Sequence, residues 1–352
     1  MKLPFYIHTT DDMNKRWRIV GILLVVVCVA FTLGLWYTLE ESNTQIAANR
    51  LSNDKDVVLD TMEKRLEVYS DVLYGGRALF LIDPELSRND WDTFMDSQNL
   101  FERYPALNMV AYVQATDRRG VEEILSDVNT QTRSGESNAV LFPDRETEKY
   151  AIVKYTTQIE GFRMVGLNAY ADDAAAVMLD TAAVKAVPVA SKPIMSRHQD
   201  RTGTMDVLIA LAVYERTYRN GMSDDEKQAR LKGYIMASIH PETLFQQAVG
   251  SLNNPDSVAI LVETQDSTTV YEYGSDLNGS RIAQTSTINV AGQAWNITLS
   301  APAIYDLTPR QIYAPLFFLV AGLVFMVIVV NLFFYWTGVR FTRHKPTPKR
   351  SK

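Results

Sequence analysis

The chain has 352 residues, 47% of them hydrophobic and 22% charged, and it carries a formal net charge of −6 at pH 7. Because an acidic balance repels phosphate groups, it argues against a nucleic-acid-binding protein, and we expect no nucleic-acid partner. The single cysteine, Cys28, excludes a disulfide within the chain, so a large domain must be held together by its core alone.

Two apolar runs lie near the ends of the chain. Residues 19–37 and residues 312–335 contain no charged side chain, and each run is long enough to cross a hydrocarbon core of about 30 Å as a helix. We therefore predict two transmembrane helices. A cleaved signal peptide is the alternative for the first run, but no small-x-small cleavage site follows Tyr37, which favours an uncleaved anchor.

The flanking charges predict the orientation of these helices. Residues 1–18 are basic close to the first run, Glu40 and Glu41 follow that run, and residues 336–352 are basic and contain no acid. Since basic flanks stay in the cytoplasm, we predict that both termini are cytoplasmic and that residues 38–311 are a periplasmic domain of a bacterial inner (plasma) membrane protein. The basic residues are Lys2, Lys15, Arg16, Arg18, Arg340, Arg343, Lys345, Lys349, Arg350 and Lys352.

Residues 38–82 are predicted to form a stalk helix. Apolar side chains recur there at mostly three- and four-residue steps, and Asp83-Pro84 must stop the helix. At about 1.5 Å per residue the stalk is about 65 Å long. Its apolar face packs either on a partner's stalk in a homodimer or on its own domain, and the sequence leaves both alternatives open. The apolar positions are Val58, Met62, Leu66, Tyr69, Leu73 and Phe80.

The pair Gly75-Gly76 interrupts this helical pattern, where each glycine costs up to about 1 kcal/mol relative to alanine. Such a pair permits either a hinge in the stalk or the close approach of a neighbouring segment. Both interpretations stay open at this level.

Residues 83–240 alternate short helices with short strands and are predicted to form a membrane-distal lobe. Asp172 and Asp173 cap an alanine-rich helix. Strands joined by short connections favour antiparallel sheets with helices on one side. Further helices are expected from Ser87 and over residues 121–128, and strands over residues 108–114, 150–155, 163–167, 206–214 and 234–240.

Residues 241–311 repeat this pattern on a smaller scale and are predicted to form a membrane-proximal lobe. Pro241 starts a helix that ends near residue 249, and four β-like segments follow it. The predicted fold class is therefore α+β, with two transmembrane helices flanking an ectodomain made of a long stalk helix and two antiparallel-sheet lobes.

Motifs for catalysis are absent from the sequence. It contains no nucleophile elbow, glycine-rich phosphate loop, paired-cysteine metal site or HExxH helix. We therefore expect no enzyme, no metal and no cofactor. His198, in the predicted turn SRHQDRTG, is either a ligand or proton sensor or a solvated side chain without a role.

Several segments in order resemble the CHASE family, the extracytoplasmic ligand-sensing domain of many bacterial sensor kinases and cyclic-di-GMP enzymes and of plant cytokinin receptors. The resemblance covers about residues 59–250. It rests on the segments RLEVYSDVLYGGRALF, RYPALNMVAYV, AAAVMLDTAAVKAVPVAS, AVYERT and LKGYIMASIHPETLF.

This resemblance implies two PAS-like lobes on a long stalk, a small-molecule pocket in the membrane-distal lobe, and homodimers packed along the stalks. Ser191 falls at the family's Thr/Ser position on the pocket strand, and Tyr155, Leu208, Ala210 and Ala212 are expected on neighbouring pocket strands. Ala212 replaces the family's usual proline before Val-Tyr. Cytokinin binding is not implied, because the acidic residue that holds the adenine ring in the plant receptors has no clear counterpart here.

The expected function is a membrane-anchored sensor module for an unknown small ligand. Family members normally continue into a kinase, a cyclase or a phosphodiesterase, whereas this sequence stops after the second apolar run. We therefore expect the signal to pass through the stalk and transmembrane helices to a separate cytoplasmic or membrane protein. The alternatives are a periplasmic protein-binding scaffold and a truncated remnant of a sensor kinase or cyclic-di-GMP enzyme.

Overall fold

The computed structural model describes residues 10–133, 136–158, 164–196, 204–215, 221–274 and 281–337. His198 and the tail from residue 338 onward lie outside the described residues. The chain divides into two compact units, one of Met1–Arg50 with Ala303–Lys352 and one of Leu51–Pro302.

Helix α1 (Thr10–Ile82) is a single helix of 73 residues that contributes to both units. It ends at Ile82, as predicted, because Pro84 lacks the N–H that would continue it. The predicted apolar face of the stalk is buried within the chain itself, which favours a helix that lies on its own domain. The buried positions are Val58, Met62, Leu66, Tyr69, Leu73 and Phe80.

The first unit contains α8 (Pro309–Thr337) and the apolar part of α1, and both helices are long and apolar enough to be candidate membrane spans. They approach closely at Gly322, where an added Cβ would lie 2.5 Å from Thr32 Cγ2. Small residues permit this kind of contact between helices in lipid. Asn43 Nδ2 also donates a hydrogen bond to the carbonyl oxygen of Gln311 at 2.7 Å.

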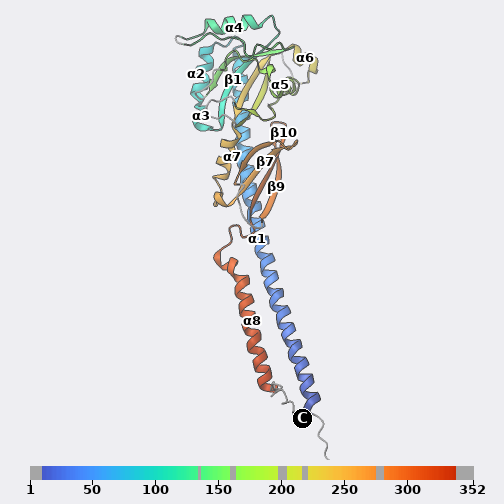
Figure 1. The fold of residues 1–352 in the computed structure, drawn as a ribbon. Helices are drawn as coiled ribbons and strands as arrows, with labels where there is room; N and C mark the ends of the chain where they lie inside the picture. The colour runs from blue at the N-terminus through green and yellow to red at the C-terminus, as the bar shows by residue number, and fades with distance from the viewer. Residues whose placement is uncertain are drawn as a thin grey trace, which may run out of the picture. The chain divides into compact units, whose positions relative to one another are not determined.

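The second unit is built on two antiparallel sheets (Figure 1). The first sheet has the strand order β2-β1-β6-β5-β3, and β4 also pairs with β5. All the pairs in this sheet are antiparallel, as the sequence predicts, although the pair β1–β6 joins strands that are far apart in the sequence. The strands are β1 (Leu107–Thr116), β2 (Tyr150–Gln158), β3 (Val189–Ala190), β4 (Ile194–Met195), β5 (Met205–Tyr214) and β6 (Leu231–Ile239).

Helices cover both faces of the first sheet. On one face, α5 (Asp173–Lys185) packs Met178, Leu179 and Ala182 into a common core with Ala210 and Met236 of the sheet. On the other face, Gly76 of α1 lies against Ile235 of β6. The remaining helical segments of this half are α2 (Arg88–Gln98), α3 (Leu100–Arg103), α4 (Val121–Thr130), η1 (Ala169–Ala171) and α6 (Asp224–Ala229).

The second sheet has the strand order β8-β7-β10-β9 and packs against α7 (Pro241–Val249). Phe245 of α7 stacks on Tyr271, with ring centroids 5.3 Å apart, and contacts the buried Trp295. The two-residue turn Ala291-Gly292 has positive φ at both positions, as a tight hairpin requires. The strands are β7 (Ala259–Thr264), β8 (Thr269–Tyr273), β9 (Arg281–Val290) and β10 (Gln293–Pro302), and η3 (Pro255–Ser257) precedes them.

The strand expected over residues 163–167 is not formed by its described part. Residues 164–168 make only isolated bridges, from Leu167 to Phe142 and from Asn168 to Ile152. Gly166 has a φ of +92° and lies so close to the carbonyl oxygen of Val140 that an added Cβ would stand 2.3 Å from it. This left-handed turn breaks the extended backbone that the apolar pattern suggests.

Candidate functional site

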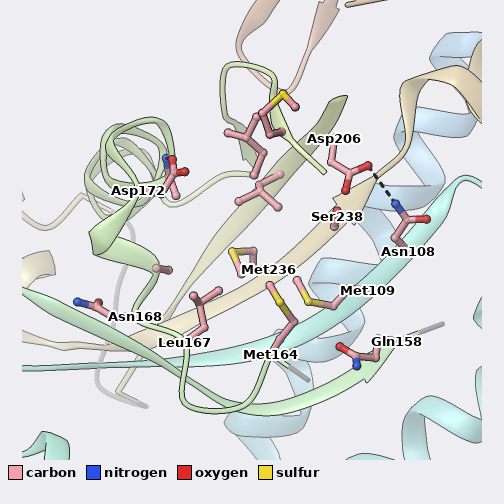
Figure 2. A pocket seen from close by; sticks show the side chains of 15 residues that line it. Asn108, Met109, Gln158, Met164, Leu167, Asn168, Asp172, Asp206, Met236 and Ser238 are labelled. Atoms are coloured by element: carbon pink, nitrogen blue, oxygen red, sulfur yellow. Dashed lines mark hydrogen bonds between the residues drawn. The ribbon is translucent and has the colours of Figure 1, made fainter. Parts of the chain in front are cut away.

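A cavity of about 70 Å³ lies on the face of the first sheet that α5 covers (Figure 2). Its floor comes from β1, β5 and β6 through Met109, Leu208 and Met236, and its wall comes from η1 and the start of α5 through Ala169 and Ala175. Residues far apart in the sequence therefore line one space. Such a concave and mostly apolar space is typical of a small-molecule site.

The described lining of this cavity includes the methionines Met109, Met164, Met195 and Met236. Methionine is unbranched and polarisable, so it fits its shape to different neighbours. Met195 is 57% exposed, whereas Met109 and Met236 are buried. We therefore place the mouth of the cavity beside Met195 and its floor at the two buried methionines.

A buried polar cluster centred on Asp206 lies at one end of the cavity (Figure 2). Asn108 Nδ2 donates to Asp206 Oδ1 at 3.1 Å, and His240 Nδ1 lies 3.1 Å from the same oxygen. The Ser196 hydroxyl donates to Asp206 Oδ2 at 2.8 Å. Burying a carboxylate costs free energy unless it is hydrogen-bonded, so these three partners allow the Asp206 side chain to be buried in the domain. The hydroxyl-bearing Ser238 lines the same end.

A β-bulge brings Asn108 into this cluster. Leu107 pairs with Ile239 and Met109 pairs with Ser238, so Asn108 is an extra residue on β1. An extra residue changes the face to which neighbouring side chains point. As a result Asn108 and Met109 both line the cavity, although they are adjacent in the sequence.

Asn168 and Asp172 lie at the opposite side of the cavity (Figure 2). Asn168 Oδ1 accepts the backbone N–H groups of Ala151 and Tyr170, both at 3.2 Å. Asp172 caps α5, as its position in the sequence predicts, and accepts the N–H groups of Ala174 and Ala175. These two polar side chains therefore hold the wall of the cavity in place.

The predicted site residues on β5 share one face of the strand, but only Leu208 lines the cavity. Ala210 and Ala212 are fully buried in the core beneath α5. Ser191 lies beside β5, where its hydroxyl accepts the Leu208 N–H at 3.1 Å and donates to the Lys192 carbonyl oxygen at 2.7 Å. Its hydroxyl therefore joins two backbone segments next to the cavity.

Tyr155 lies on the opposite face of the first sheet. Tyr112 pairs with Tyr155, whereas Val113 pairs with Val153, so Lys154 is an extra residue on β2. Without this bulge, alternation from Val153 would bring Tyr155 to the face that α5 covers. Instead the Tyr155 hydroxyl donates to the Leu86 carbonyl oxygen at 2.9 Å, and its ring packs near Trp91.

Sequence reasoning missed Asp206, Asn108 and His240 as members of the site. Asp206 offered a signal, because a carboxylate inside the apolar run MDVLIALAVY needs a buried partner. Asn108 offered none, since its place depends on the register between β1 and β6.

The Asp206–His240 pair resembles half of a catalytic triad, but its surroundings do not complete one. His240 Nε2 lies 3.5 Å from Glu242 Oε2, so in the described residues the imidazole faces a second carboxylate where a triad has a nucleophilic hydroxyl. No group of three His, Cys, Asp or Glu residues suited to a metal occurs among the described residues either. The cluster can bind and orient a polar group.

A second cavity of about 240 Å³, on the same face of the sheet, is lined by Tyr170 and Tyr234. The two hydroxyls lie 3.2 Å apart, and the Tyr170 hydroxyl donates to Asp180 Oδ1 at 3.0 Å. Burial raises the pKa of Tyr234 to about 12, so its hydroxyl stays protonated at neutral pH. Because Lys149 already pairs with Asp180 at 2.8 Å, this group is satisfied internally.

Comparison with solved structures finds sensory and receptor domains at low sequence identity. An extracellular ligand-binding receptor from Desulfohalobium retbaense is 10% identical over 73% of this chain and 40% of its own, with a TM-score of 0.42. A domain of a sensory box/GGDEF family protein from Vibrio parahaemolyticus is 9% identical over 75% and 97%, with a TM-score of 0.43. The sensory domain of the Campylobacter jejuni chemoreceptor Tlp3 is 10% identical over 76% and 96%, with a TM-score of 0.39. No curated protein matches the chain.

The CHASE domain family matches residues 84–271, which is more than half of the chain and contains both the cavity and the Asp206 cluster. The match confirms the resemblance seen in the sequence, but it begins at residue 84, after the stalk segment of the predicted range 59–250, and extends beyond residue 250 into the second sheet. CHASE domains are extracytoplasmic sensory domains. The chain therefore belongs to the CHASE domain family.

Proposed function

We propose that this chain is a membrane-anchored, non-enzymatic sensor that binds a small ligand in the cavity beside Asp206. The observation that carries the proposal is the cavity itself, which combines adaptable apolar walls with one buried hydrogen-bonding cluster. In this proposal residues 19–37 and 312–335 anchor the chain in a bacterial inner membrane. Both termini are cytoplasmic, and residues 83–240 and 241–311 form PAS-like distal and proximal periplasmic lobes.

Strand β6 offers a route from the ligand to α1. Met236 and Ser238 line the cavity. Ile235, the residue before Met236, points to the other face of the sheet and contacts Gly76 of α1. A ligand that moves β6 would therefore move the packing of α1. We propose that the stalks pair in a homodimer through the side of α1 that the domain does not bury, and that they pass this movement to a separate signalling protein. Such coupling requires that the ligand bind two arrangements of the stalk with different affinity.

The second sheet offers another route, through the backbone next to Ser191. The Ala190 N–H donates to the Ala291 carbonyl oxygen at 2.8 Å, and Gln293 Nε2 donates to the Ala190 carbonyl oxygen at 3.3 Å. Lys192 forms an ion pair with Asp266 at 2.5 Å. These contacts support the proposal that a structural change at the cavity is also transmitted to the second sheet, which precedes α8 in the chain.

The test is a thermal-shift screen of the purified full chain in a non-ionic detergent, against metabolites of several chemical classes. A ligand at a hundred times its Kd stabilises by about 2.7 kcal/mol, and each kcal/mol raises the melting temperature by about 2 to 4 °C in a domain of this size. Met195→Trp narrows the mouth of the cavity at an exposed position. Val177→Trp is the matched control, since Val177 is exposed on α5 away from the cavity lining.

A compound that stabilises the wild type and Val177→Trp, but not Met195→Trp, would support the proposed function. Equal stabilisation of all three proteins would show that the compound binds at a site other than this cavity. If no compound in any class shifts the transition, the sensor function fails and a periplasmic protein-binding role becomes the better account.

A further inference from the structure

We propose that the ligand carries a protonated amine and that Asp206 is the residue that recognises it. This inference rests on the proposed function, because it names the chemical class of ligand for the same cavity. It starts from the hydrogen-bonding capacity of Asp206. An ionised carboxylate offers about four acceptor positions, and Asn108, His240 and Ser196 occupy three of them. Among the described residues this leaves one position, on Oδ2, at the end of the cavity that Asp206 lines.

The charge around this position favours a cation. Asp206 and Asp172 are the ionisable side chains of the described lining, and both are acidic. His240 stands between Asp206 and Glu242, at 3.1 and 3.5 Å. If His240 is neutral, these three groups carry two negative charges, and if it is protonated they still carry one. In either state the cluster attracts a cation and repels a carboxylate.

The rest of the cavity selects what the amine is attached to. Met109 and Met236 form a buried apolar floor, and Leu167 and Leu208 add aliphatic surface. A short aliphatic chain would bury its methylene groups there. The Ser238 hydroxyl, at the same end as Asp206 (Figure 2), provides a second acceptor for the ammonium hydrogens. The ligand class is thus a small aliphatic primary amine.

The experiment compares four probes of matched carbon chain on the purified full chain in a non-ionic detergent at pH 7. The probes are n-butylamine, N-butylacetamide, 1-butanol and butyrate, and saturation-transfer NMR detects binding in the millimolar range expected for such small molecules. We expect n-butylamine to bind and the other three to bind at least tenfold more weakly. Because N-butylacetamide removes the charge from the ligand, this comparison needs no substitution in the protein.

Two variants then test which acidic side chain of the cavity binds the amine. Asp206→Asn should weaken n-butylamine binding by about 10- to 100-fold, which is the range expected for a hydrogen bond to a charged group. Asp172→Asn is the matched control, since it removes the other acidic charge of the cavity while asparagine keeps the cap of α5. Its effect should be several-fold smaller. Equal losses in the two variants would overturn the specific role of Asp206.

The other outcomes separate this inference from the proposed function. If 1-butanol, butyrate or another non-amine compound binds better than the amine and Met195→Trp abolishes that binding, the cavity is a ligand site but the amine inference is wrong. If no probe and no compound of the wider screen binds, the proposed function fails and the inference fails with it.

Discussion

Gly76 of α1 packs directly against Ile235 of β6, and a Cβ added to Gly76 would lie 3.0 Å from Ile235 Cγ2. Its neighbour Gly75 has more room, since an added Cβ there would lie 3.8 Å from Phe94 Cζ. The helix continues through both glycines without interruption. Of the two interpretations of this pair, close packing therefore accounts for Gly76, and no break in the helix marks a hinge.

This difference predicts opposite effects of two alanine substitutions. Gly75→Ala should raise the free energy of unfolding by up to about 1 kcal/mol, the gain in helix propensity. Gly76→Ala gains the same propensity but overpacks a core position, at a cost of about 1–3 kcal/mol, so the net change should be a loss of about 1 kcal/mol. Thermal unfolding followed by tryptophan fluorescence, to which the buried Trp91 and Trp295 contribute, measures both.

A double-mutant cycle tests the contact itself. Ile235→Ala removes the Cγ2 and Cγ1 atoms that an added Cβ at Gly76 would meet, so Gly76→Ala should cost less in that background than in the wild type. If the cost of Gly76→Ala is unchanged by Ile235→Ala, the two residues do not interact as described.

Tyr155→Phe is predicted to reduce stability without changing ligand affinity. The hydroxyl donates to the Leu86 carbonyl oxygen at a buried position, and loss of such a hydrogen bond costs about 0.5–1.5 kcal/mol. The ring lies on the face of the sheet opposite the cavity, as the pairing around Lys154 requires. A tenfold change in affinity for a cavity ligand would restore Tyr155 as a ligand-binding residue.

Ser191→Ala should destabilise the first sheet by about 1–3 kcal/mol, because the substitution leaves the buried N–H of Leu208 without the hydroxyl that accepts it. Ser191→Thr keeps the hydroxyl and serves as the matched control. Urea unfolding measures both variants. Equal stability of Ser191→Ala and the wild type would show that another acceptor takes over.

The ion pair between Lys192 and Asp266 predicts a pH dependence below pH 4. The hydrogen bond from Lys192, followed by that from Thr264, lowers the pKa of Asp266 from its ordinary value of 3.8. A carboxyl group whose pKa is lowered by folding contributes stability above its unfolded pKa and loses it as the pH falls through the folded pKa. The stability advantage of the wild type over Asp266→Asn should therefore be constant above about pH 5 and shrink as the pH falls from 4.

Melting temperatures of both proteins between pH 6 and pH 2 measure this difference. Because both side chains are partly exposed, added salt should reduce the advantage at neutral pH. An advantage that grows on acidification would contradict the assignment.

The parts of the fold that depend on local sequence were predictable. The expected strand over residues 206–214 corresponds to β5 (Met205–Tyr214), and the expected helix over residues 121–128 to α4 (Val121–Thr130). The caps of α2 at Ser87 and of α5 at Asp172 accept backbone N–H groups as expected. Periodicity and capping act within a few residues, so the sequence carries them directly.

The candidate site was less predictable because its composition depends on how distant strands align. Asn108 and Lys154 are bulged residues, and each decides which neighbouring side chains face the cavity. Nothing within β1 or β2 marks these positions, since a bulge is a property of two paired strands. The predicted Leu208 lies in the lining because β5 keeps a regular register around it, whereas Tyr155 follows a bulge.

Under the proposed function, the alternation along β6 has an evolutionary consequence. Met236 and Ser238 contact the space for a ligand, and Ile235 contacts the stalk, so the two roles belong to different residues of one strand. Mutations at the first two positions can change what is recognised while the packing of α1 is kept. A lineage can in this way exchange one stimulus for another by a few substitutions and retain an inherited mechanism of response.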